Sequence, residues 1–182
     1  MRTLLVACFL LACGAHAAPA PRTVRVEGWP PIPFAPSGLG LRTLLDIHDT
    51  LRPLPPPRGP GWARSVHGPW VDERAEALAL ANEARRWLRR ASPQELAVGA
   101  AIHGDIAART ATQLEDVDLR ALPAEAAAAV RAPTAQLRRR AYEAWTVCVE
   151  YAAGSELDAW RRACDARRRA LGLGRSVPSP LD

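Results

Sequence analysis

Cys148 and Cys164 carry the clearest chemistry in this sequence, because an even pair of cysteines in an oxidising compartment is typical of one disulfide. A metal site would need further ligands, and a redox site usually has two cysteines separated by two residues beside a helix start. Neither pattern surrounds this pair. We therefore expect a structural disulfide, which stabilises by about 3 kcal/mol for a closed loop of about 15 residues.

A helical hairpin would position these two cysteines. Residues 134–153 have helical periodicity, and Gly154 suits the left-handed position that ends a helix. Ser155 and Asp158 fit a capping box that begins the next helix. Both cysteines then face the seam between the helices, but they are out of register by about 6 Å, so a tilt or a frayed first turn must bring them together.

His103 and Asp105 lie close enough in sequence to suggest a general base or a metal ligand. The helical face of His103 is otherwise largely apolar, with Leu96, Ile106 and Leu114 at helical spacing, and this favours a histidine of the core. His48 and His67 lie in other segments, without a motif.

Three acids at the end of the same segment resemble calcium ligands, namely Glu115, Asp116 and Asp118. They lack the glycine-centred loop and the terminal bidentate glutamate of such a site, so we interpret them as a solvated helix end. The sequence has no glycine-rich phosphate loop, nucleophile elbow or zinc-protease motif. We expect no catalytic residue, metal site or cofactor.

All 24 basic residues are arginine, which is typical of a GC-rich genome, and the formal net charge is +5. The composition therefore explains much of the high isoelectric point, and we expect no specific nucleic-acid partner. Two arginine clusters lie toward helix ends, where the helix dipole favours positive charge. The third, Arg138, Arg139 and Arg140, has no such explanation and is a candidate site for anionic lipid or polyanion.

Residues 1–17 have the pattern of an export signal, with Arg2, an apolar run and a small-x-small site at 15–17. The run is too short to span a membrane. We expect cleavage after Ala17, which would place the mature protein in the periplasm or outside the cell. The alternative is a lipoprotein in which Cys13 is acylated and anchors the chain in the envelope.

Residues 18–70 form a proline-rich arm in this interpretation, since twelve of the seventeen prolines lie between residues 19 and 69. Within the arm we expect a short strand at 23–27 and one helix at 39–51. The aromatic residues Trp29, Trp62 and Trp70 are unusual for a disordered linker. We expect them to dock on the helical part or to bind a partner.

The pattern from residue 71 to 173 is that of an antiparallel bundle of about four to five helices, followed by a disordered tail at 174–182. The expected helices are 72–91 with a cap at Asp72, a second from Ser92 to about Val117, 123–131, and the cysteine-bearing hairpin. In the first helix Leu80 and Trp87 belong to the predicted buried stripe, whereas Arg74 belongs to the polar side. The predicted fold class is all-α.

The absence of catalytic spacing favours a non-enzymatic protein of the bacterial envelope that binds another envelope protein, as an interaction or scaffold module. Two alternatives stay open at this point. One is a binder of anionic lipid or polyanion through the arginine-rich faces. The other is an enzyme whose residues meet only in the folded chain.

Overall fold

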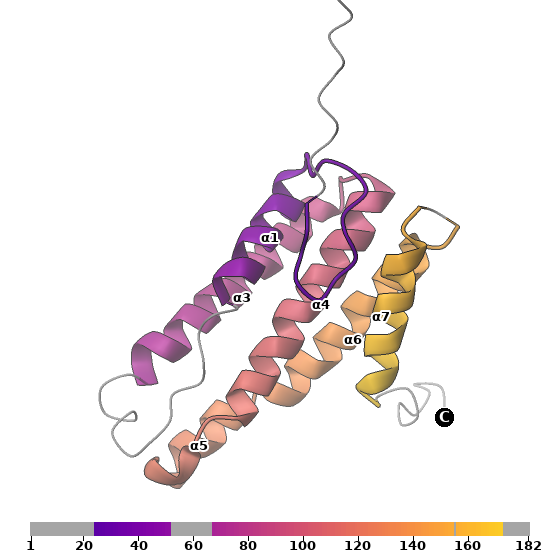
Figure 1. Cartoon of the computed structure of the whole chain (residues 1–182). Helices are drawn as coiled ribbons and strands as arrows, with labels where there is room; N and C mark the ends of the chain where they lie inside the picture. Colours follow the sequence, from indigo (N-terminus) through magenta and orange to yellow (C-terminus); the bar gives the residue numbers. More distant parts are fainter. Residues whose placement is uncertain (1–23, 52–66, 155, 173–182) are drawn as a thin grey trace, which may run out of the picture.

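The computed structural model describes residues 24–51, 67–154 and 156–172, and these form an all-α bundle (Figure 1). The predicted fold class is confirmed. Its elements are α1 (Leu39–Leu51), α3 (His67–Leu88), α4 (Pro93–Glu115), the 3₁₀ turn η1 (Leu119–Ala121), α5 (Ala124–Arg131), α6 (Thr134–Tyr151) and α7 (Asp158–Ala170). In place of a strand at 23–27, the described part of this segment has one isolated bridge, between Val24 and Ile32. No helix among these residues is long and apolar enough to cross a membrane.

α4 is the central helix, and its residues from Ala97 to Ala107 are all buried. Small side chains allow the neighbouring helices to approach it closely. A Cβ atom on Gly104 would lie 2.6 Å from Nε1 of Trp145 on α6, which leaves room only for glycine. The same Trp145 Nε1 donates a hydrogen bond to the carbonyl of Ala101 at 3.2 Å. These contacts fix the crossing of α4 and α6.

The start of α4 confirms the predicted cap. Ser92 is the N-cap, its side chain accepts a hydrogen bond from the backbone N–H of Glu95, and Pro93 occupies the first turn. The predicted start of the preceding helix at Asp72 is wrong, because α3 begins at His67. Its first turn includes Pro69, where the missing N–H would have no intrahelical partner.

The predicted disulfide joins Cys148 of α6 to Cys164 of α7, with the two Cα atoms 6.4 Å apart. The second helix starts later than expected, since α7 begins at Asp158 and its N-cap, Leu157, makes no side-chain cap; Ser155 of the expected capping box lies outside the described residues. Leu157 lies in a turn before the helix. This later start reduces the register difference that a helix beginning at the capping box would have had.

The segment from Val24 to Gly38 packs against the bundle through three buried residues, Val26, Trp29 and Ile32. The indole of Trp29 stacks on Trp160 of α7, and Nε1 of Trp160 donates a hydrogen bond to the carbonyl of Pro31. α1 then lies antiparallel to α3, where Gly40 permits close contact with the carbonyl of Ala84. This part of the arm therefore belongs to the same core as the helices.

Candidate functional site

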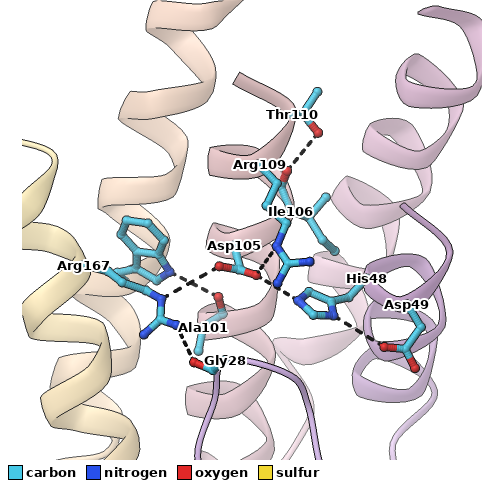
Figure 2. Close-up of polar contacts among 10 residues, drawn as sticks. Gly28, His48, Asp49, Ala101, Asp105, Ile106, Arg109, Thr110 and Arg167 are labelled. Atoms are coloured by element: carbon cyan, nitrogen blue, oxygen red, sulfur yellow. Dashed lines mark hydrogen bonds and ion pairs between the residues drawn. The ribbon is translucent and has the colours of Figure 1, made fainter. Parts of the chain in front are cut away.

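A buried polar network lies where the arm, α1, α4 and α7 meet, and Asp105 is at its centre (Figure 2). Oδ2 of Asp105 is 2.8 Å from Nε2 of His48 and 2.8 Å from Nε of Arg109. Nε of Arg167 lies 3.9 Å from Oδ1 of the same carboxylate. Arg167 also donates to the carbonyl of Gly28, so the network connects α1 and α4 to α7 and the arm.

Burial by itself raises the pKa of Asp105, but the hydrogen bond from His48 and the charges of Arg109 and Arg167 outweigh it. The net pKa is lowered from its ordinary value of 3.8, so Asp105 is ionised at neutral pH. Burial also lowers the pKa of Arg167, against the opposing effect of Asp105. The guanidinium of Arg167 covers the Trp29 ring at 3.8 Å.

This network joins α1, α4, α7 and the arm, and its central groups are largely shielded from solvent. His48 is 1% exposed, and Asp105 accepts from groups on three sides. The partner of Asp105 is therefore His48, 57 residues away in sequence, whereas the neighbouring His103 lies elsewhere. Sequence reasoning noticed both histidines but could not pair His48 with Asp105.

Glu95 fastens the end of the arm in a similar way. Its Oε1 accepts hydrogen bonds from the backbone N–H groups of Ser37 and Gly38, at 2.8 and 2.7 Å, and from the Ser37 hydroxyl. Burial raises the pKa of Glu95, and these bonds, with one from the Ser92 N–H, lower it to a net value below 4.5. The same carboxylate thus completes the capping box of α4 and holds the turn before α1.

His103 is buried in the contact of α4 with α3 and α6, as the sequence predicted for a core histidine. Its Nε2 lies 3.4 Å from Oδ1 of Asn82. Burial, together with the charges of Arg85 and Arg140, lowers the pKa of His103 to about 4. The ring is therefore neutral at physiological pH. Among the described residues, no cluster of three or more His, Cys, Asp and Glu could hold a metal ion.

A groove of about 490 Å³ lies between α1 and α3. We call it the α1–α3 groove. Its floor is apolar and includes Ile47, Leu51 and Ala77, while its acidic side chains are Asp46, Glu73 and Glu76. Leu80 lies at one wall and is 44% exposed. An apolar groove with charged edges can bind a ligand or a partner.

Trp87 and three arginines lie at the end of α3 and in the turn that follows it, and they line a second hollow of about 470 Å³. Trp87 is 41% exposed, and Arg86, Arg89 and Arg90 surround it. We call these four residues the Trp87 cluster. Within the described part of the chain, none of its arginines has an acidic side chain at ion-pair distance.

The prediction that Leu80 and Trp87 are buried, with Arg74 on the polar side, is wrong. Arg74 is 2% exposed and lies 3.6 Å above the ring of Trp70, and its Nε donates to Gln113. Because α3 packs through Trp70, Arg74, Ala81, Ala84 and Leu88, the residues Leu80 and Trp87 fall at the edge of the packed face. The sequence does contain a sign that Leu80 and Trp87 are exposed. Three acids share their side of the helix at spacings of three and four residues, namely Glu73, Glu76 and Glu83.

The aromatic residues predicted to bind a partner lie in different environments. Trp29 and Trp70 are 8% and 6% exposed, so most of their surface already contacts the protein itself. Trp62 lies outside the described residues, as does Cys13. Neither buried tryptophan offers a free ring to another molecule.

The arginines proposed for anion binding lie on α6. Arg138 forms a two-point ion pair with Glu115, which lowers the pKa of that acid and raises the pKa of Arg138. Arg139 is exposed and Arg140 is half-buried. On α7, Arg161 and Arg162 pair with Asp158, and Arg168 and Arg169 pair with Asp165. These acids reduce the positive field of both helices.

Comparison with known proteins finds no matching protein-family profile, no similar curated protein and no similar solved structure.

Proposed function

We propose that this protein is a non-enzymatic interaction module that binds another protein through the α1–α3 groove. The observation that carries the proposal is that most of the exposed large apolar side chains lie on α1 and α3, the two helices that form this groove. Among the described residues, the large apolar side chains with high exposure are Leu39, Leu80, Trp87 and Tyr151, and the first three lie on α1 and α3. Exposed apolar surface with a polar rim is typical of protein–protein contact.

The acids at the groove specify the chemistry of its partner. Asp46, Glu73 and Glu76 line the same hollow as Ile47 and Leu80. Three carboxylates close together favour a partner whose surface carries positive charge. We expect the bound surface to combine basic side chains with at least one large apolar side chain, which would fill the groove.

The test is a photo-crosslinking amino acid introduced at Leu80, in cells that make the full chain. Crosslinks from this position should yield peptides of a protein partner. The matched control is the same amino acid at Tyr151, which is equally exposed, at 45%, but lies on α6. If position 80 gives no more protein crosslinks than position 151, the groove is not the binding surface.

A second function, binding of anionic lipid, is favoured by the Trp87 cluster, since an exposed tryptophan suits a membrane surface when the arginines around it form no ion pair with a described residue. Binding of the purified protein to vesicles with about one-third anionic lipid should then fall steeply between low and physiological salt. Replacing Arg86 and Arg90 by Gln should abolish it, while the paired Arg138→Gln should change it little. We expect weak vesicle binding and therefore rank protein binding first.

We also propose export, on the basis of the leader and of a disulfide of the kind that persists in oxidising compartments. The mature chain should begin at Ala18 or Pro19 and carry no lipid, which an intact mass determines. A mass with a diacylated or triacylated Cys13 would instead make the protein membrane-anchored.

A further inference from the structure

The outer side of α3 has opposite charges at its two ends. Glu73, Glu76, Leu80, Glu83 and Trp87 recur at spacings of three and four residues, so they lie along one side of the helix. The acids Glu73 and Glu76 are near the start, and Arg86 and Arg90 follow about three turns later. All of these side chains are exposed.

Such a surface is complementary to itself when two copies lie antiparallel. Trp87 is 11 residues from Glu76, which corresponds to about 16 Å along the helix axis. A two-fold axis near Leu80 and Glu83 brings Trp87 of each copy level with Glu76 of the other. The same arrangement brings Arg90, in the turn directly after α3, toward Glu73 of the partner copy, and Arg86 within one turn of Glu76.

The α1–α3 groove lies at the position where the partner's indole would arrive. Glu73, Glu76 and Leu80 line it, and its volume of about 490 Å³ exceeds that of one indole side chain. Glu73, Glu76, Arg86 and Arg90 form no ion pair with another described residue, so their charges are available to a second copy. The charges therefore select the antiparallel orientation, and the apolar contacts supply most of the affinity.

We propose that the protein forms a two-fold symmetric dimer in which Trp87 of each copy inserts into the α1–α3 groove of the other. This inference rests on the proposed function, because it assigns the occupant of the same groove. A contact from Glu73 of α3 to Arg90 in the turn after it buries roughly 500 Å² per copy, at the low end for specific interfaces. The dimer is therefore concentration-dependent, with a dissociation constant in the micromolar range.

Sedimentation of the mature protein from about 1 to 200 µM tests the dimer, because this range brackets the expected dissociation constant. The average mass should rise toward twice the monomer mass. Trp87→Ala and Leu80→Asp should each weaken association at least tenfold. The control Tyr151→Ser, at a residue with the same exposure outside the interface, should leave association unchanged, and far-UV circular dichroism verifies that each variant folds.

Charge reversal distinguishes this arrangement from any other self-association. The double variant Glu73→Arg with Glu76→Arg should be monomeric, and so should Arg86→Glu with Arg90→Glu, because each homodimer would face like charges at both ends. A mixture of the two variants should regain dimers, since both ends of the mixed pair are complementary. Glu150→Arg, on α6, is the matched control and should dimerise like the parent protein.

Three outcomes overturn the dimer: a monomer at every concentration, dimers that survive both reversals, or a mixture that does not regain association. Crosslinks from Leu80 to residues 52–66 of the same chain would also overturn it, by showing another occupant. If the protein is monomeric but position 80 crosslinks to a different protein, the proposed function stands and only the dimer fails. Salt-sensitive vesicle binding, without dimers and without protein crosslinks from position 80 above those from position 151, would point instead to lipid, and both proposals would fail.

Discussion

The indole rings of Trp29 and Trp160 are stacked, with their centroids 5.0 Å apart and their planes within 13° of each other. Trp29 belongs to the proline-rich arm and Trp160 to α7, so one aromatic contact joins segments 131 residues apart in sequence. The guanidinium of Arg167 covers the Trp29 ring at 3.8 Å and connects it to Asp105. Aromatic packing and the guanidinium of Arg167 therefore hold the arm against α7 at the same place.

Replacing Trp29 by Ala should lower the free energy of unfolding by about 3 kcal/mol or more, because a large buried ring is lost and a cavity remains. Trp29→Phe should cost less, since Trp29 Nε1 has no hydrogen-bond partner among the described residues. Urea denaturation at neutral pH measures both effects. Tyr151→Ala, at an exposed aromatic residue, is the control and should change stability by less than about 0.5 kcal/mol. A similar small effect of Trp29→Ala would show that the arm does not contribute to the core.

The stability of the protein should decrease as the pH falls from 6.5 to about 4, because of His103. Its pKa is about 4 in the folded protein and 6.5 in the unfolded chain, so the unfolded chain binds the proton first. The contribution is fully present above pH 6.5, and up to about 3 kcal/mol is lost on acidification. His103→Gln should flatten the dependence of unfolding free energy on pH in this window. An unchanged slope in that variant would mean that His103 does not titrate as a buried group.

A second acid-sensitive region should begin below about pH 4, because the pKa of Asp105 is lowered from 3.8 by the folded structure. Its ion pairs stabilise the fold above the unfolded pKa, and that stabilisation is lost as the pH falls through the lower, folded pKa. In Asp105→Asn the protein should be less stable at neutral pH and should lose the additional slope below pH 4. Asp46→Asn is a suitable control, since Asp46 is exposed at the groove.

Gly104→Ala should destabilise the protein by about 1–3 kcal/mol, despite the higher helix propensity of alanine. The new Cβ would lie 2.6 Å from Nε1 of Trp145 and 3.1 Å from the backbone carbonyl of Ala141, so the α4–α6 crossing must open. Gly99→Ala on the same helix is the matched comparison, because the nearest atoms to its Cβ would belong to the Leu88 side chain and not to backbone. We expect a clearly smaller change there. Equal melting temperatures for the two variants would contradict the close α4–α6 contact.

Thiol titration of the denatured, unreduced mature protein should detect essentially no free sulfhydryl, because Cys148 and Cys164 are joined. Reduction, or Cys148→Ala together with Cys164→Ala, should lower stability by about 3 kcal/mol. Calorimetry with and without reductant measures the change. Two cysteines that react readily in the native protein would place the α6–α7 seam in a different register.

Local sequence patterns identified most of the helices. The cap at Ser92, the helix 39–51 and the cysteine-bearing hairpin depend on neighbours three or four residues away, and the structure has all three. The start of α3 was misplaced because Pro69 is compatible both with an arm and with a first helical turn. Leu80 is part of the predicted buried stripe because periodicity shows which side of a helix is apolar. It does not show how much of that side the neighbouring helices cover.

The sequence by itself determined the helical class, the disulfide and the core position of His103, since each follows from composition and short-range spacing. Only the tertiary structure paired His48 with Asp105, stacked Trp29 on Trp160, buried Arg74 and left Trp87 exposed. These relationships join residues from separate helices, or depend on which part of a helix surface a neighbour covers. Helical spacing shows which side chains lie on the same side of one helix. Which of them contact another helix depends on how the helices pack.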